Sequence, residues 1–267
     1  MHPVDIAPCL TELRAQRPLV HNITNYVVMN FTANALLAIG AAPVMAHAVE
    51  EVADMVGLAS ALVVNIGTLS SPWIAAMKKA VMAAGDRGIP YILDPVGAGA
   101  TPFRTETAQA LLTLRSPTVI RGNASEIAAI ANAASKTRGV DSTLAASDAL
   151  TAARTLSQQF DTTVVISGEV DYIIQGDRQV EIHNGDRLMG QVTGMGCTAT
   201  ALLGAFAAVA PPFEAAVATM ATMGIAGELA VQQANGPGTF VPHFLDALAA
   251  LSADTLTTHA HLVATKP

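Results

Sequence analysis

Cysteine, aromatic residues and charge are all scarce in this chain. Its 267 residues include two cysteines, Cys9 and Cys197, and only 4% aromatic and 13% charged residues. Two cysteines provide neither a disulfide framework nor the spacing of a zinc site, which favours a reducing cytoplasm. The 14 lysine and arginine residues are scattered and the net charge is −7, which argues against a basic surface for nucleic acid. We therefore expect a cytoplasmic protein whose partners are small molecules.

Signals for secretion or for a membrane span are also missing. Residues 1–10 have neither the basic nor the apolar region of a signal peptide. No charge occurs between Arg187 and Glu214, but that stretch contains Gln191, several glycines and a Pro-Pro pair. A loop followed by a buried helix fits this composition better than a bilayer span, so we expect no membrane association.

Apolar material, in contrast, is plentiful, at 51% of residues and a mean hydropathy of +0.43. Short apolar segments alternate with helical patterns, which indicates an α/β fold with a mostly parallel sheet and helices on both faces. The predicted parallel strands are residues 19–21, 43–45, 61–65, 91–93, 118–120 and 163–166. An antiparallel edge hairpin is predicted at 172–175 and 179–183, a polar loop near 136–141, and three Ala-rich helices follow the last glycine turn. Without repeats or linkers, residues 1–267 are assigned to one domain.

The most informative stretch is 191–204, which reads QVTGMGCTATALLG. Gly194 and Gly196 precede Cys197 and an uncharged segment of good helix formers. A Gly-x-Gly turn at a helix start leaves backbone N–H groups unpaired and unobstructed, and the helix dipole favours an anion there. The stretch therefore predicts a phosphate-binding hole with Cys197 at its edge. A simple bend between strand and helix is the alternative.

Several polar residues follow the predicted strands at their carboxyl ends, where open α/β sheets bind ligands. These residues are Asn25, Asp94, Arg121, Glu126 and Ser167. Individually each has an ordinary structural explanation, such as a turn-capping aspartate or a first-turn glutamate. Together, two carboxylates for Mg²⁺, an arginine for phosphate and an anion hole indicate phosphoryl transfer.

Other catalytic motifs can be excluded. The sequence has no G-x-x-x-x-G-K-[ST] phosphate loop, no protein-kinase catalytic loop or D-F-G, no G-x-S-x-G and no H-E-x-x-H. Gly194, Gly196 and Ala199 do fit the dinucleotide fingerprint G-x-G-x-x-A. That fingerprint belongs in the first strand-to-helix turn, with an acidic residue about 20 residues later. Here it lies near the C-terminus, so we reject it.

Four ordered motifs, spanning about residue 19 to the C-terminal helices, resemble the hydroxyethylthiazole kinase family. They are HNITNYVVMNFTANALLAIGAAPVMAHA from His21, DPVGAGAT from Asp94, RGNASEI from Arg121 and VTGMGCTATA from Val192. The resemblance implies a three-layer ribokinase-like fold. It also implies ATP-dependent phosphorylation of the hydroxyl of 4-methyl-5-(2-hydroxyethyl)thiazole, in thiamine biosynthesis and salvage.

The resemblance further implies a homotrimer with sites between subunits, and it distributes the site residues among three ligands. It places the thiazole at Met45, Gly194 and Asn25, ATP at Arg121 and Ser167, and Mg²⁺ at Asp94 and Glu126.

The catalytic base remains open at this stage. Related ribokinase-like kinases carry aspartate where this chain has Cys197. A thiol is mostly protonated at neutral pH, although a helix N-terminus can lower its pKa. We expect Cys197 to orient the substrate hydroxyl and act as a weak base; the alternatives are a buried small residue there, or His21 or His47 as base. For the whole chain, another small-alcohol kinase, an ATP-dependent dehydratase and a non-catalytic nucleotide-binding regulator stay open.

Overall fold

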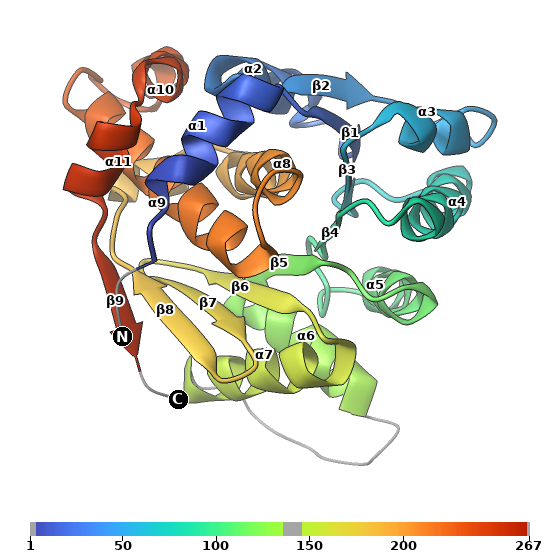
Figure 1. Cartoon of the computed structure of the whole chain (residues 1–267). Helices are drawn as coiled ribbons and strands as arrows, with labels where there is room; N and C mark the ends of the chain where they lie inside the picture. Colours follow the sequence, from blue (N-terminus) through green and yellow to red (C-terminus); the bar gives the residue numbers. More distant parts are fainter. Residues whose placement is uncertain (1–3, 136–145, 266–267) are drawn as a thin grey trace.

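The computed structural model describes residues 4–135 and 146–265, and its centre is a nine-stranded sheet (Figure 1). The strand order is β2-β1-β3-β4-β5-β6-β7-β8-β9. The parallel strands are β1 (Leu19–Ile23), β2 (Ala42–Met45), β3 (Ala61–Asn65), β4 (Tyr91–Asp94), β5 (Val119–Asn123) and β6 (Thr163–Ser167). The antiparallel strands are β7 (Asp171–Gln175), β8 (Arg178–Ile182) and β9 (Leu262–Thr265). The predicted mostly parallel sheet with an antiparallel edge hairpin is therefore confirmed.

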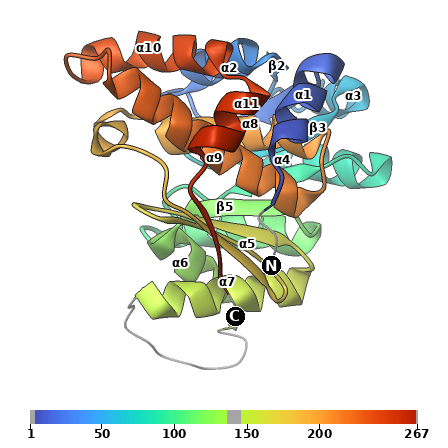
Figure 2. The same ribbon diagram turned by 60° about the vertical axis from the view of Figure 1, so that its left-hand side comes forward.

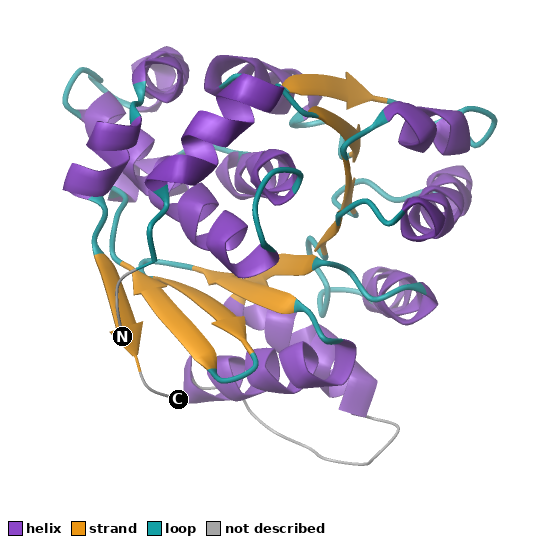
Figure 3. Cartoon of the chain, in the orientation of Figure 1, coloured by secondary structure: helices purple, strands orange, loops and turns teal. Residues whose placement is uncertain are grey.

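Helices cover both faces of this sheet, as Figures 2 and 3 show. One face carries α3 (Val52–Leu58), α4 (Ser71–Arg87), α5 (Pro102–Leu114), α6 (Ala124–Ser135) and α7 (Ala146–Phe160). The other carries α1 (Ala7–Gln16), α2 (Met29–Ile39), α8 (Met195–Ala207), α9 (Pro212–Val231), α10 (Pro237–Ala250) and α11 (Ala253–His259). Each face has its own apolar core, because the buried central parallel strands present apolar side chains to both sides.

Helix α8 is the buried helix that the glycine-rich stretch predicts, and it lies near the middle of the molecule with the sheet curving around it (Figure 1). Its residues from Thr198 to Ala207 are all buried. Gly204 allows the helix to approach the sheet closely, since a Cβ there would come within 2.6 Å of Val63 and 3.0 Å of Val20. This close packing fixes the position of the glycine turn relative to β1 and β3.

Besides the short 3₁₀ turn at Arg187–Gln191, three elements are not anticipated by the sequence patterns. Helix α1 precedes the first strand, α11 is a fourth helix after the glycine turn, and β9 adds a further strand beside β8. All three elements are short, and α1 and α11, from opposite ends of the sequence, pack against each other. Tertiary contacts therefore stabilise these elements, which local sequence patterns do not predict. The polar loop near 136–141 lies outside the described residues.

Helix α9 is the one helix in the described ranges that is long and apolar enough to cross a membrane by composition. Its most apolar window is 78% buried inside the fold, as in the core helix of a globular protein. The uncharged stretch before it, from residue 188 onwards, forms the short 3₁₀ turn η1 (Arg187–Gln191), the glycine turn and α8.

Candidate active site

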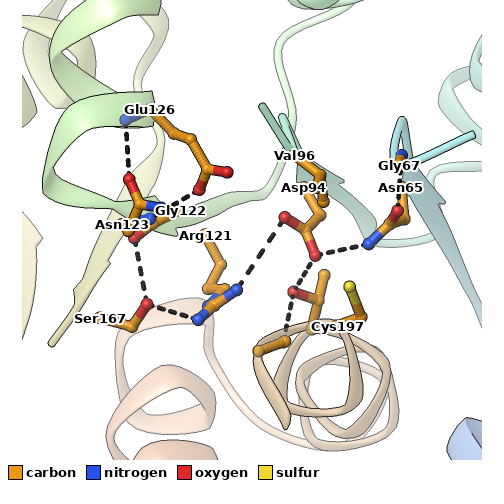
Figure 4. A network of polar contacts seen from close by, with 12 residues as sticks. Asn65, Gly67, Asp94, Val96, Arg121, Gly122, Asn123, Glu126, Ser167 and Cys197 are labelled. Carbon is orange, nitrogen blue, oxygen red and sulfur yellow. Dashed lines mark hydrogen bonds and ion pairs between the residues drawn. The ribbon is translucent and has the colours of Figure 1, made fainter. Parts of the chain in front are cut away.

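Four of the polar residues that the sequence places at the carboxyl ends of the strands, Asp94, Arg121, Glu126 and Ser167, lie together at one edge of the sheet (Figure 4). Asp94 ends β4, Arg121 lies within β5 and Ser167 ends β6. The Arg121 guanidinium donates to the Ser167 hydroxyl, and its Nη1 lies 4.0 Å from Asp94 Oδ1. It also covers the start of α8, since a Cβ on Gly196 would come within 2.6 Å of Nη1. The carboxylate, the guanidinium and the glycine turn therefore share one rim.

The glycine turn has the geometry of an anion site. Gly194 is the N-cap residue of α8 with φ of +88°, a left-handed conformation that favours glycine. The first backbone hydrogen bond at this end runs from Thr198 N to Gly194 O at 2.8 Å. The N–H groups of residues 195–197 precede that bond and have no acceptor within the helix. The positive end of the helix dipole adds to their attraction for phosphate.

Asp94 is a fully buried carboxylate, and one of its two oxygens accepts no hydrogen bond. Its Oδ2 accepts hydrogen bonds from Asn65 Nδ2 and Thr200 Oγ1, both at 2.7 Å, whereas the buried Oδ1 accepts none. Burial raises the pKa of Asp94 to about 6, although Arg121 and the Thr200 hydrogen bond act in the opposite direction. An orphaned buried carboxylate oxygen beside a phosphate site fits a Mg²⁺ ligand.

Glu126 is also at this edge, but both its oxygens are engaged. Its Oε2 accepts from Asn123 N at 2.8 Å while Asn123 Oδ1 accepts from Glu126 N at 2.9 Å, a reciprocal capping box at the start of α6. Its Oε1 accepts from Gly97 N at 2.8 Å and so ties the loop after β4 to α6. Each carboxylate oxygen keeps a second lone pair, so Glu126 still fits a metal role, directly or through water.

Cys197 lies in the first turn of α8 and is half-buried. Its Sγ accepts a hydrogen bond from Asn25 Nδ2 at 3.4 Å. Burial, followed by the charge of Asp94, raises the pKa of this thiol to about 11. The pKa of this thiol is therefore raised, whereas the sequence also allowed a lowered pKa at a helix N-terminus. At neutral pH Cys197 is a protonated thiol.

The two histidines considered as alternative bases have structural contacts. His21 is buried in β1, where its Nε2 is 2.8 Å from Ala46 O, and burial lowers its pKa. The His47 ring lies 4.4 Å from the Trp73 ring, centroid to centroid, beside Tyr26. These contacts favour a role for both histidines in holding the loops after β1 and β2.

A cavity of about 720 Å³ opens beside the rim, in the size range of small-molecule sites. The loops 167–171 and 183–190 and helices α8 and α9 form its walls, and Arg121, Ser167 and Gly196 line it. The residues predicted for ATP thus border one cavity. Of the predicted thiazole residues, Met45 ends β2, beside β1, and Gly194 in the turn packs against Val28 at the start of α2. Asn25, beyond the end of β1, contacts Cys197.

The sequence interpretation missed two residues that contact Asp94. Asn65 ends β3 just as Asp94 ends β4, so the position of a polar residue after an apolar strand could have revealed it. Thr200 lies four residues after Gly196 in α8, on the same helix face, and its hydroxyl reaches Asp94. The Asn123-x-x-Glu126 spacing is a capping-box pattern that could have indicated the contact of Glu126 with Asn123 N, whereas no local pattern indicates its contact with Gly97 N.

Comparison with known proteins supports the resemblance. A model of the hydroxyethylthiazole kinase family matches residues 10–254. A hydroxyethylthiazole kinase from Syntrophus aciditrophicus is 58% identical over 255 residues, which cover 94% of both chains. The solved structure of a hydroxyethylthiazole kinase from Pyrococcus horikoshii is 43% identical, with a TM-score of 0.91 over 98% of this chain and 99% of that one. A Staphylococcus aureus pyridoxal kinase, solved with AMP-PCP and pyridoxal, has 16% identity and a TM-score of 0.69 over 94% and 99% of the two chains, and shows the fold alone.

These matches extend over nearly the full length of both partners, so they concern the whole fold rather than a local motif. They include the glycine turn, the strand ends and the edge hairpin described above. The chain therefore belongs to the hydroxyethylthiazole kinase family.

Proposed function

We propose that this chain, acting as one domain, transfers the γ-phosphoryl group of ATP to the hydroxyl of 4-methyl-5-(2-hydroxyethyl)thiazole in thiamine biosynthesis or salvage. The observation that carries the proposal is the convergence of the open start of α8, the Arg121 guanidinium and the buried Asp94 carboxylate on one rim. Family membership identifies the acceptor class, and the rim supplies the groups that phosphoryl transfer needs.

The donor side is assigned to the 720 Å³ cavity. ATP occupies it with its phosphates towards Arg121 and Ser167, where the guanidinium pairs with phosphate oxygens. The N–H groups of residues 195–197 receive the charge on the transferred group. Because these donors are held by a buried helix, they need no rearrangement during the reaction.

Asp94 and Glu126 are assigned to Mg²⁺, directly or through water. Asp94 offers Oδ1, which accepts no hydrogen bond and lies 4.0 Å from Arg121 Nη1, and Glu126 offers the remaining lone pairs of its capping carboxylate. A magnesium ion held by these two carboxylates would neutralise phosphate charge during the transfer. Two carboxylates with phosphate and water as further ligands are the usual magnesium environment in kinases.

The acceptor side is assigned to Met45, Gly194 and Asn25, with Cys197 between it and the phosphate. The Cys197 side chain orients the substrate hydroxyl. Only its thiolate form can accept the hydroxyl proton, and a group with a pKa of about 11 is mostly the neutral thiol at neutral pH, so Cys197 acts as a weak base. A loose phosphoryl-transfer transition state tolerates late proton loss.

The test uses purified protein, ATP, Mg²⁺ and a panel of alcohols, with ADP release as the signal. Release stimulated by the thiazole alcohol alone supports the proposal. Release with another alcohol indicates a different small-alcohol kinase, and release with hydrated nicotinamide cofactors indicates a dehydratase. ATP binding without acceptor-stimulated release indicates a regulator. Omitting Mg²⁺ and substituting Arg121→Ala serve as negative controls for the rim.

We also propose that the chain works as a cytoplasmic homotrimer with sites between subunits. The side chains of Tyr26 and Val27 are 64% and 69% exposed, directly after the Asn25 assigned to the acceptor. Apolar side chains this exposed beside a site suit a contact with a second copy of the chain. Light scattering on the purified protein measures the assembly mass directly, and a monomer at assay concentration contradicts the trimer.

A further inference from the structure

Asn65 is a buried amide that contacts both halves of the site. It ends β3 with 1% of its surface exposed. Its Nδ2 donates to Asp94 Oδ2 at 2.7 Å, and its Oδ1 accepts from Asn25 Nδ2 at 3.0 Å. The same Asn25 Nδ2 donates to Cys197 Sγ at 3.4 Å. A continuous chain of hydrogen bonds therefore joins the buried carboxylate on the donor side to the thiol on the acceptor side.

Backbone donors fix the direction of this chain. Gly67 N donates to Asn65 Oδ1 at 2.9 Å, and Val27 N donates to Asn25 Oδ1 at 3.1 Å. Since each N–H needs an oxygen opposite it, neither amide can rotate by half a turn without losing a bond. Asn65 must therefore present its nitrogen to Asp94, and Asn25 its nitrogen to Cys197. Figure 4 shows Asn65 between the loop at Gly67 and the Asp94 carboxylate.

Gly67 provides the space in which the two amides meet. A Cβ at this position would lie 2.6 Å from Asn25 Nδ2 and 2.9 Å from Asn65 Oδ1, well inside van der Waals contact. Glycine is needed here for space. The loop after β3 is thus shaped around the amide pair, and the nearby Arg104 guanidinium donates to its carbonyls at Ile66 and Gly67 at 3.0 and 2.9 Å.

We propose that Asn65 is a positioning residue that couples the Asp94 carboxylate to the Asn25–Cys197 pair, with Gly67 leaving the space for this contact. The proposal rests on the proposed function of the rim. Asn65 holds Asp94 Oδ2, so that Oδ1 faces the cation and phosphates. Through Asn25 it holds the thiol that faces the acceptor. Substitution at Asn65 therefore disturbs both substrates' sides at once, although Asn65 touches neither substrate.

The test compares Asn65→Ala and Gly67→Ala with matched controls. Ser157→Ala removes an equally buried polar group that makes two hydrogen bonds away from the site, to Thr162 O at 2.7 Å and from Gly176 N at 2.9 Å. Gly57→Ala adds a Cβ where nothing lies within 4 Å. The controls measure what general destabilisation does to each signal.

Two measurements need no acceptor and report the two ends separately. Calorimetry with AMP-PCP and Mg²⁺ reports the Asp94 end. The rate of Cys197 alkylation by iodoacetamide at fixed pH, located by mass spectrometry, reports the Asn25 end, because the Asn25 N–H stabilises the reactive thiolate. We expect Asn65→Ala to weaken AMP-PCP binding about 10-fold or more, to slow alkylation several-fold and to lower kcat about 10- to 100-fold.

Gly67→Ala should give the same pattern with smaller changes, and both controls should match wild type. If a folded Asn65→Ala protein changes one end only, or neither, the coupling is refuted. If Asn65→Ala does not fold, Gly67→Ala tests the coupling instead. Wild-type values for both AMP-PCP binding and Cys197 alkylation in Gly67→Ala then refute the coupling. A wild-type protein that fails to bind AMP-PCP refutes the proposed function instead, while the alkylation comparison still tests the Asn25 end.

Discussion

Replacing Cys197 by aspartate tests directly whether this side chain takes the proton of the acceptor. Burial and the charge of Asp94 raise the pKa of the Cys197 thiol to about 11. Each pH unit below the pKa lowers the ionised fraction tenfold, so roughly one thiol in a thousand is ionised at about pH 8. An aspartate at the same position has an ordinary pKa of about 4, and it stays ionised at that pH even when burial raises its pKa by two units.

The population of base therefore increases by up to about 1000-fold in Cys197→Asp. A carboxylate is a weaker base than a thiolate, which offsets part of the gain, and late proton transfer reduces the benefit further. We expect kcat of Cys197→Asp to equal the wild-type value or exceed it by up to about tenfold. Cys197→Ala, which lacks a base, should lower kcat while ATP binding stays nearly unchanged.

The assay is ADP release at saturating ATP and thiazole alcohol between about pH 6.5 and about pH 9.5. Wild-type kcat should rise with pH, with a limiting slope of about tenfold per unit, whereas Cys197→Asp should be nearly flat. AMP-PCP affinity, measured for all three proteins, separates catalysis from binding. A Cys197→Ala enzyme with unchanged kcat would exclude Cys197 from the mechanism.

Three further predictions concern stability and nucleotide binding. Burial raises the pKa of Asp171 to about 6, so the folded wild-type protein loses stability as pH rises from about 4 to about 6. In Asp171→Asn the amide Oδ1 can still accept from Gly168 N. Urea unfolding should therefore show a free energy of unfolding at most about 3 kcal/mol higher than wild type at pH 7.5, and no difference below about pH 4. Glu228 accepts hydrogen bonds from Asn184 Nδ2 and from the backbone N–H of residue 185, and so holds one wall of the cavity. Glu228→Ala should raise KM for ATP several-fold and leave KM for the acceptor unchanged, and Glu228→Gln should bring KM for ATP back to the wild-type value. Equal effects on both KM values would contradict this role. The Arg14 guanidinium donates hydrogen bonds to the backbone carbonyls of residues 39, 248, 249 and 251. Arg14→Ala should therefore lower the free energy of unfolding by about 2 to 4 kcal/mol. A decrease below about 0.5 kcal/mol would show that these hydrogen bonds contribute little.

Most of the architecture is visible in the sequence because its signals are local. A parallel strand buried on both faces needs a continuous apolar run, so the strand Ala61–Asn65 can be recognised from its sequence alone. Gly194 adopts a left-handed conformation and begins a buried helix, as its Gly-x-Gly context predicts. Polar residues at the carboxyl ends of the strands meet at one edge because parallel strands share a direction, which brings Asp94, Arg121 and Ser167 together. Short elements such as β9 depend on contacts with distant residues and escape this kind of prediction.

Properties that depend on distances between segments far apart in the chain are decided only by the tertiary structure. Asp94 is 29 residues from Asn65 and 106 from Thr200 in sequence, yet both donate to the same oxygen, and the other oxygen accepts no hydrogen bond. The sequence identifies Cys197 as a thiol at a helix start, but only packing decides that burial and the charge of Asp94 raise its pKa. Local patterns determine which elements form and where their polar ends lie. Hydrogen bonding and desolvation act over only a few ångströms, so hydrogen-bond partners and pKa shifts are determined only when the elements pack together.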